Sequence, residues 1–174
     1  TIEMKSPPRM TEAIDIFLGL FAGDGGEGLI GFLDMLGTTE PSAQMRAALK
    51  IMEDGAMSTA QYQGLIIRLD LWRSELLAFM DQYDVLLCPV YAHPAPKSLT
   101  TFETREHVLP PELFAYTAPF NLTGWPVAVV RIGEAAGDLP IGVQVVAKPW
   151  REDVALAVAA HLENTLGGFV PPAL

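Results

Sequence analysis

The residue types able to act as nucleophiles or general bases are few in this chain. The only cysteine, Cys88, together with His93 or His107, offers the pair that a cysteine hydrolase brings together in space. Cys88, however, follows three apolar residues and precedes Pro89, a setting in which cysteine is usually a small buried hydrophobic residue. We therefore interpret Cys88 as a core residue, and no feature of the sequence lowers its expected pKa.

The sequence shows no clear pattern for a serine nucleophile or for a metal site. The five serines lie outside any Gly/Ser-rich segment, and the adjacent pairs Lys5–Ser6 and Lys97–Ser98 stand beside prolines. The histidines show no spacing typical of metal ligands, and none of the acidic residues forms a distinguished pair for glycoside hydrolysis. We expect no metal and no cofactor, and we expect His161 to lie on the solvated side of a C-terminal helix.

Composition narrows the class of protein further. The 174 residues are 50% hydrophobic, which is enough for one sizeable core. A net charge of -10 disfavours binding to nucleic acid or to anionic membranes, and no apolar run reaches the roughly 18 to 20 residues of a membrane span. With a single cysteine and no internal disulfide, a cytoplasmic protein without nucleic-acid or membrane partners is the expectation.

A glycine-rich segment at residues 23–28 follows a predicted helix, which a polar cap at Thr11 opens and an apolar run at 14–21 continues. The segment is a formal G-x-G-x-x-G match, but a dinucleotide site needs a preceding strand. Asp24 and Glu27 would also repel a phosphate. We predict a glycine C-cap and a turn instead.

Three further helices are expected in the N-terminal half, at residues 29–36, at 42–52 and after a capping box at Ser58–Gln61. The last of these carries apolar residues at three- and four-residue spacing. Such a stripe can line a ligand tunnel, but we interpret it as a core face. Its members are Tyr62, Leu65, Ile66, Leu69, Trp72, Leu76, Phe79 and Met80.

The C-terminal half changes to strand patterns. Residues 85–88 predict a strand buried on both faces, residues 127–132 and 141–147 predict a hairpin with a long loop, and residues 152–166 predict a helix. The chain therefore divides into a mainly helical segment, 1–82, and a strand-rich segment with a terminal helix, 83–174. We expect the two to form part of one α/β domain.

Three motifs carry a family resemblance: Y-D-V-L-L-C-P at residues 83–89, N-L-T-G-W-P at 121–126 and L-P-I-G-V-Q at 139–144, with a weaker D-G-G turn at 24–26. Together they resemble the C-terminal part of amidase-signature enzymes, especially those that cleave acyl amides. The resemblance implies a mixed central sheet flanked by helices. Two loop positions depart from the family pattern, since Arg131 precedes Ile132-Gly133 where a proline is common, and Asp138 replaces a usual glycine.

The resemblance also implies a chemistry, namely hydrolysis of carboxamides through a serine nucleophile, a cis-peptide serine and a lysine base. In the family these residues lie upstream of the matched region, so none is assigned in this chain. The expected role is scaffold and substrate-pocket wall. The expected partners are an N-terminal part that carries the triad and a small-molecule amide, and a homo-oligomer stays open. The alternative is a noncatalytic binding module or partner subunit built on the same fold.

Five residues are the predicted substrate contacts. Tyr91 and His93 follow the carboxyl end of the strand at 85–88, where open α/β sheets place ligands. Asn121 and Thr123 offer side-chain hydrogen bonds before Gly124, and Trp125 precedes a proline that fixes the start of the next strand. For Asn121 and Thr123, turn structure is the favoured alternative to substrate contact.

Overall fold

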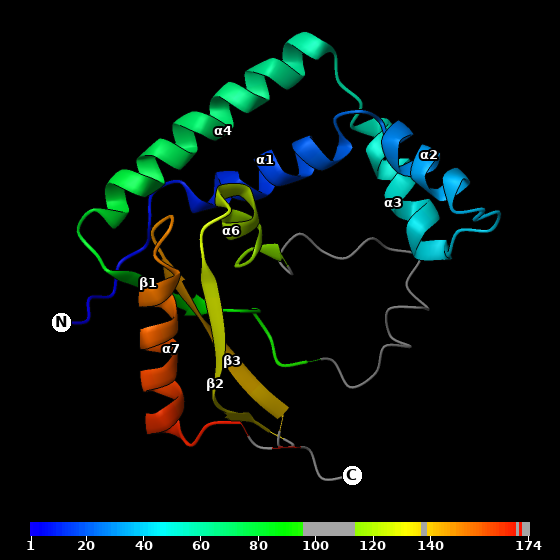
Figure 1. Ribbon diagram of the computed structural model, residues 1–174. Coiled ribbons are helices and arrows are strands. Elements are labelled where there is room, and N and C mark those ends of the chain that lie inside the picture. The colour runs from blue at the N-terminus through cyan, green and yellow to red at the C-terminus, as the bar shows by residue number, and fades with distance from the viewer. Residues whose placement is uncertain (96–113, 137–138, 170, 172–174) are drawn as a thin grey trace.

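A computed structural model describes residues 1–95, 114–136, 139–169 and 171. Four helices precede the strands: α1 (Met10–Ala22), α2 (Glu27–Met35), α3 (Ala43–Asp54) and α4 (Thr59–Met80). Figure 1 shows α1 and α4 above the sheet, with α4 outermost, and α2 and α3 at the far end of α1. The four predicted helices are therefore present.

Helix α4 begins at the predicted capping box. The Ser58 hydroxyl accepts the Gln61 backbone N–H at 3.3 Å, and the Gln61 side-chain oxygen accepts the Ser58 backbone N–H at 2.8 Å. Much of the predicted stripe is core, since Leu69, Trp72 and Leu76 are buried together with Met80. The first member of the stripe, Tyr62, stays exposed and lines a pocket described below.

The glycine-rich segment is a turn, as predicted. Gly25 and Gly26 have φ angles of 70° and 84°, the left-handed region that glycine adopts without strain. Asp24 closes the turn, because its carboxylate accepts the Gly26 N–H at 2.8 Å and the Gly28 N–H at 2.9 Å. Gly23 follows the last residue of α1, but its backbone is right-handed, with φ -60°. The first left-handed glycine is Gly25, two residues later, so the chain changes direction there. The Asp24 carboxylate thus accepts the backbone N–H groups at the start of α2.

A three-stranded antiparallel sheet follows, in the order β1 (Val85–Pro89), β3 (Leu139–Ala147), β2 (Val127–Ala135). The predicted hairpin of β2 and β3 is present, with Val127 opposite Val146 and a bulge between Arg131 and Gly133. The predicted long loop is wrong, because the paired strands extend to Ala135 and start again at Leu139. All pairings among the described strands are antiparallel. The expectation that β1 is buried on both faces is wrong for the described chain, because β1 lies at an edge and Leu87 is 42% exposed.

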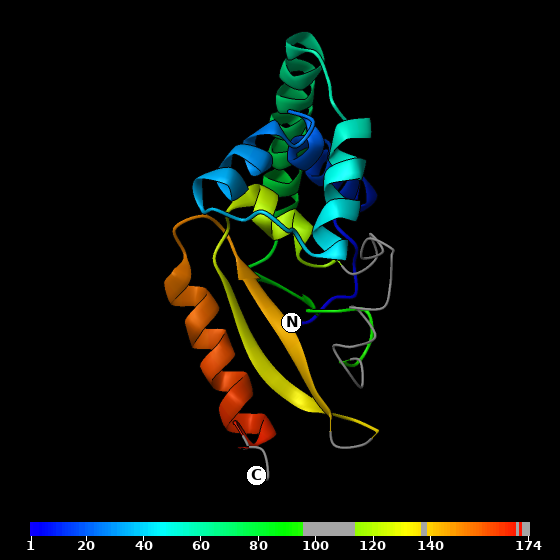
Figure 2. The ribbon, with the colours of Figure 1, turned by 90° about the vertical axis from the view of Figure 1, so that its right-hand side faces the viewer.

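Helices cover both faces of the sheet. Helix α7 (Glu152–Leu166), with the predicted bounds, packs on β2 and β3 and buries Ala155 and Ala159 (Figure 2). The opposite face belongs to the main core, in which Val146 of β3 meets side chains of α1, α4 and the short helix α6 (Ala118–Thr123). The buried members of this core are Ala13, Ile16, Leu69, Trp72, Leu76, Met80, Phe120, Leu122, Trp125 and Val146.

Among the described residues, no single helix has the length and hydropathy needed to cross a membrane, and α1 with α2 meets that test only as a pair bent by 54°.

Candidate functional site

A buried glutamine joins three segments at the centre of the sheet. Gln144 on β3 is only 4% exposed, and its side-chain amide nitrogen donates hydrogen bonds of 2.8 Å to the backbone carbonyls of Pro89 and Tyr116. The two N–H groups of the amide match these two acceptors. Gln144 therefore fixes the end of β1 and the segment that leads into α6 to the middle strand.

Cys88 lies beside this glutamine, with its Sγ atom 3.6 Å from the Gln144 side-chain nitrogen. Burial raises the pKa of the Cys88 thiol to about 11. A thiol in this state stays protonated at neutral pH, and the protonated form is a poor nucleophile. The structure thus agrees with the interpretation of Cys88 as a core residue, and His107, one of its candidate bases, lies outside the described residues.

Tyr91 and His93 come together just beyond the end of β1. Their rings lie edge to face, with centroids 6.2 Å apart. Tyr91 is half-buried and His93 is exposed. Because Gln144 holds the carbonyl of Pro89, the point from which this loop departs is fixed. Contact of these two side chains with substrate stays a prediction.

The predicted residues on the other segment shape a corner. The Thr123 hydroxyl donates to the Phe120 carbonyl at 3.2 Å and accepts the Trp125 N–H at 3.3 Å, as the favoured turn interpretation expects. Trp125 is buried in the core, whereas Asn121 is exposed on α6. Contact of Asn121, Thr123 and Trp125 with substrate likewise stays a prediction.

The end of α6 is anchored by α4. Arg73 donates from Nε to the Leu122 carbonyl at 2.7 Å and donates to the same oxygen from Nη2. A guanidinium at this position also complements the partial negative charge of a helix C-terminus. The corner that carries Asn121, Thr123 and Trp125 is therefore tied to the longest helix of the chain.

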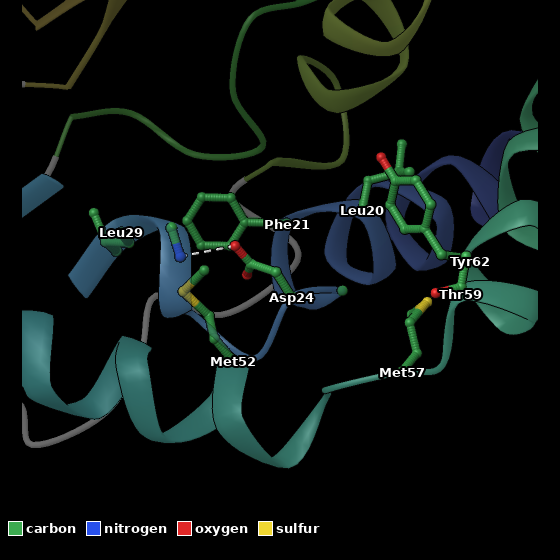
Figure 3. A pocket seen from close by; sticks show the side chains of 10 residues that line it. Leu20, Phe21, Asp24, Leu29, Met52, Met57, Thr59 and Tyr62 are labelled. Atoms are coloured by element: carbon green, nitrogen blue, oxygen red, sulfur yellow. Dashed lines mark hydrogen bonds between the residues drawn. The ribbon is translucent and has the colours of Figure 1, made fainter. Parts of the chain in front are cut away.

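A pocket between the four N-terminal helices was not predicted. Its volume is about 610 Å³, and its lining is mostly apolar, with Asp24, Thr59 and Tyr62 as the polar side chains (Figure 3). The lining comes from the end of α1, the following turn, α2, α3 and the start of α4. Its residues are Leu20, Phe21, Gly23, Asp24, Gly28, Leu29, Met52, Met57, Thr59 and Tyr62.

Asp24 is the charged group of this pocket. Hydrogen bonds from the backbone N–H groups of Gly26 and Gly28 hold the pKa of the Asp24 carboxyl below its ordinary value. Figure 3 shows the carboxylate beside Phe21, with a dashed line marking its bond to the Gly28 nitrogen. Because both oxygens already accept backbone N–H groups, Asp24 shapes the pocket wall and is poorly placed to act as a general base.

A row of aromatic rings leads from the pocket toward the segment that Gln144 holds. Phe21 stacks on Phe17 with ring centroids 6.3 Å apart, and Phe17 stacks on Phe114 at 6.1 Å. Phe114 lies two residues before Tyr116, whose carbonyl Gln144 holds. An apolar path therefore runs from the helical pocket to the segment before α6.

The described part of the chain shows neither a serine nucleophile in place nor a metal site. Ser42 and Ser58 cap helices, Ser74 donates to the Asp70 carbonyl at 2.9 Å, and Ser6 lies exposed near the N-terminus. No group of three His, Cys, Asp or Glu side chains within the described ranges is arranged to hold a metal ion. The pair Lys97–Ser98 lies outside those ranges.

Comparison with known proteins shows the family, because the family model for Amidase matches residues 6–156. The chain belongs to the Amidase family. It is 37% identical over 118 residues to fatty-acid amide hydrolase 2 of Homo sapiens, an alignment that covers 66% of this chain and 20% of that protein. It is 47% identical over 55 residues to the 6-aminohexanoate-cyclic-dimer hydrolase of Paenarthrobacter ureafaciens, which covers 32% of this chain and 11% of that enzyme.

Solved structures agree on the fold. A fatty acid amide hydrolase superposes with a TM-score of 0.76 at 20% identity, covering 96% of this chain and 34% of that one. A 6-aminohexanoate cyclic dimer hydrolase in complex with its substrate superposes with a TM-score of 0.72 at 19% identity, covering 94% and 37%. The α/β fold is that of the amidase-signature enzymes, and the chain corresponds to the C-terminal part of these longer proteins.

Proposed function

We propose that this chain is the C-terminal part of an enzyme that hydrolyses carboxamides through a serine, cis-serine and lysine acyl-enzyme mechanism. The observation that carries the proposal is the Amidase match over residues 6–156. The catalytic triad is proposed to lie in the N-terminal part of the parent protein. The chain spans a fifth or less of the curated relatives named above, which leaves room for that part.

In the proposed reaction, the serine oxygen attacks the amide carbon, the protonated amine departs, and water then cleaves the acyl-enzyme. The chain contributes the surroundings of this reaction. The pocket at Phe21 and Tyr62 binds the acyl group, and Gln144 keeps the end of β1 and the segment before α6 in fixed positions. Fixed positions matter because a small displacement of a bound substrate strongly reduces the rate.

We propose an amide with an apolar acyl group as the substrate. Seven of the ten residues that line the pocket are leucine, phenylalanine, methionine or glycine. The stacked rings of Phe21, Phe17 and Phe114 extend this apolar surface toward Phe114. Apolar surfaces of this kind favour apolar ligands, because both are then removed from water. The name of the human relative, a fatty-acid amide hydrolase, supports the same substrate class.

The test compares the parent protein with this chain alone on a panel of primary amides from acetamide to decanamide. The parent is expected to hydrolyse decanamide with the higher kcat/KM, and the chain alone is expected to be inactive. Turnover by the isolated chain that survives replacement of every serine would overturn the proposed mechanism. A parent protein without activity on any amide would favour the noncatalytic module.

A further inference from the structure

The pocket between the N-terminal helices combines apolar walls with one charged side chain. Asp24 is the charged residue among the described residues that line it. Within the described ranges, Asp24 forms no ion pair, because its hydrogen bonds come from the backbone N–H groups of Gly26 and Gly28. The same bonds lower the pKa of its carboxyl, which is therefore ionised at neutral pH. The pocket thus holds a negative charge without a cationic partner.

The Asp24 carboxylate keeps part of its hydrogen-bonding capacity. Its Oδ1 atom accepts the Gly26 N–H at 2.8 Å, and its Oδ2 atom accepts the Gly28 N–H at 2.9 Å. A carboxylate offers about four lone-pair positions, so each oxygen can accept one further bond. An alkylammonium group has N–H donors and no acceptor, whereas a second carboxylate would be repelled. The remaining capacity therefore fits a cation.

The turn holds this carboxylate in one position. The Gly23 carbonyl accepts the Met57 backbone N–H at 3.2 Å, which ties the turn to the segment before α4. Close packing adds to this, because a Cβ added at Gly25 would lie 3.1 Å from the Cβ of Ala56. A charge that is already fixed loses little freedom when a ligand binds, and this favours binding.

Two aromatic side chains border the same part of the pocket. The Tyr62 ring packs against Gly23, since a Cβ added there would lie 3.1 Å from the ring carbon Cδ2. The Phe21 ring lies beside the Asp24 carboxylate (Figure 3). Aromatic rings attract organic cations through their faces. Phe21 and Tyr62 are 53% and 41% exposed, so an ammonium group at this end of the pocket keeps part of its hydration.

The rest of the lining restricts the shape of the ligand. Leu20, Leu29 and Met52 offer apolar surface that a small inorganic cation would leave uncovered. A wholly apolar chain would cover this surface and leave the Asp24 charge without a partner. An apolar chain that ends in an ammonium group satisfies both parts of the pocket. The net charge of -10 also attracts cationic ligands to the chain.

We propose that the pocket selects acyl groups that carry an ammonium group at the end remote from the amide, so that the substrates are amides of long ω-amino acids. This inference rests on the proposed function, which places the acyl group of the substrate in this pocket. The methylene chain contacts Leu20 and Leu29, and the ammonium group donates to Asp24 between the rings of Phe21 and Tyr62. Asp24 is then the residue that determines specificity for the charged chain end.

The experiment measures kcat/KM of the parent protein for ω-amino amides from 6-aminohexanamide to 12-aminododecanamide. Each is compared with the amide that has a methyl group in place of the ammonium group, such as undecanamide for 10-aminodecanamide. We expect kcat/KM to be higher for the ammonium compound by about 3-fold or more at one chain length at least. The neutral 10-hydroxydecanamide should show no such gain. A ratio below this value at every length, or an equal gain from the hydroxyl group, would overturn the proposal.

Two acidic residues of the same segment supply matched variants. Asp24→Asn is expected to bring the ratio between 10-aminodecanamide and undecanamide close to that of an uncharged pocket, about 1. Glu27→Gln is the control, because Glu27 is an exposed acid in the first turn of α2 outside the pocket lining, and it should keep the ratio. Equal loss in both variants would contradict the role of Asp24. Should Asp24→Asn fail to fold, as its melting curve would report, the paired amides on the unmodified protein decide the question.

Binding of the same two amides to the parent protein is measured separately by isothermal titration calorimetry. A parent that hydrolyses no amide but binds 10-aminodecanamide more tightly than undecanamide keeps the cation site and removes the proposed function. A parent that hydrolyses undecanamide at least as well as every ω-amino amide keeps the function and removes the cation site.

Discussion

The side-chain amide of Gln144 lies 2.8 Å from the carbonyl oxygen of Tyr116, a residue 28 positions earlier in the chain. A second bond of 2.8 Å reaches Pro89, at the end of β1. One buried side chain thus sets the positions of two segments that carry predicted substrate contacts, the loop with Tyr91 and the corner with Asn121. Gln144 was part of a family motif in the sequence, and its contacts now give that motif a physical role.

Replacement of Gln144 by leucine should remove the side-chain donor from two partly buried carbonyls. We expect Gln144→Leu to lower the free energy of unfolding by about 1 to 3 kcal/mol, since a hydrogen-bonding group left unsatisfied in the interior costs roughly that much and partial exposure reduces the cost. Urea denaturation of the isolated chain measures this. The control is Gln63→Leu on the exposed side of α4, which should change stability by about 0.5 kcal/mol or less. Similar values for the two variants would contradict the anchoring role.

Two consecutive leucines of α4 offer a test of the core. Leu76 is fully buried, whereas Leu77 is 41% exposed. We expect Leu76→Ala to lower the free energy of unfolding by about 2 to 5 kcal/mol through lost burial and a residual cavity. Leu77→Ala should cost under about 1 kcal/mol, because a substantial part of its side chain is already in water and its removal leaves no closed cavity. Guanidinium denaturation of both variants decides whether the buried side of the helix is assigned correctly.

The thiol of Cys88 should react slowly in the folded chain. Because burial raises its pKa to about 11, roughly one molecule in a thousand carries a thiolate at pH 8. Labelling with iodoacetamide should therefore be slow at pH 8 and should accelerate as the pH rises toward 11 or when the chain unfolds. Ser74→Cys in a Cys88→Ala background supplies an exposed thiol on α4 for comparison. Equal labelling rates for the two thiols at pH 8 would show that Cys88 is accessible and ionised.

The carboxylate of Asp24 should make the stability of the α1–α2 turn depend on pH. Its pKa is lowered in the folded chain, so its contribution is fully present above the ordinary value of 3.8 and is lost as the pH falls through the folded value. Asp24→Asn should therefore lower the melting temperature at pH 7, and the difference from the unmodified chain should shrink at pH 3. Calorimetric scans at the two pH values measure both differences. A gap that stays constant or widens in acid would contradict the bonds to Gly26 and Gly28.

The helical pocket should select the acyl group in the parent enzyme. We expect Phe21→Ala to lower kcat/KM for decanamide about 10-fold, since it removes apolar contact worth about 1.4 kcal/mol or more, and to change acetamide hydrolysis little. Phe32→Ala is the control, because Phe32 is a similarly exposed phenylalanine on α2 that lies outside the pocket lining. Equal losses for the two amides would show that Phe21 acts on the fold and not on the acyl group.

Much of the fold could be predicted from local signals. The bounds of α7, the capping box of α4 and the β2–β3 hairpin each rest on a pattern within a few residues. Helix α6 was missed because its six residues include Pro119, Asn121 and Thr123, which favour turns and are too few to show a helical period. Contacts from far away stabilise it, among them Arg73 bound to the Leu122 carbonyl.

The pocket could not be predicted from the sequence, because it too depends on contacts between distant segments. Its lining joins four helices whose relative positions depend on close backbone approaches, such as that of Gly55, where an added Cβ would lie 2.7 Å from the Ala22 side chain. No local pattern reports such an approach. The edge position of β1 was also missed, because an apolar strand predicts burial without stating which element provides it.

The membership of the main core bears on how the chain acquires its structure. Ile16 and Trp72 meet Trp125 and Val146 in one cluster, so residues of α1 and α4 share their burial with residues that are synthesised much later. The early helices therefore emerge from the ribosome with their apolar sides uncovered. Contacts of such large sequence separation form late, since the intervening chain must be ordered first. We expect this core to become stable only after β3 has been released from the exit tunnel, so the apolar sides of α1 and α4 stay exposed during much of translation.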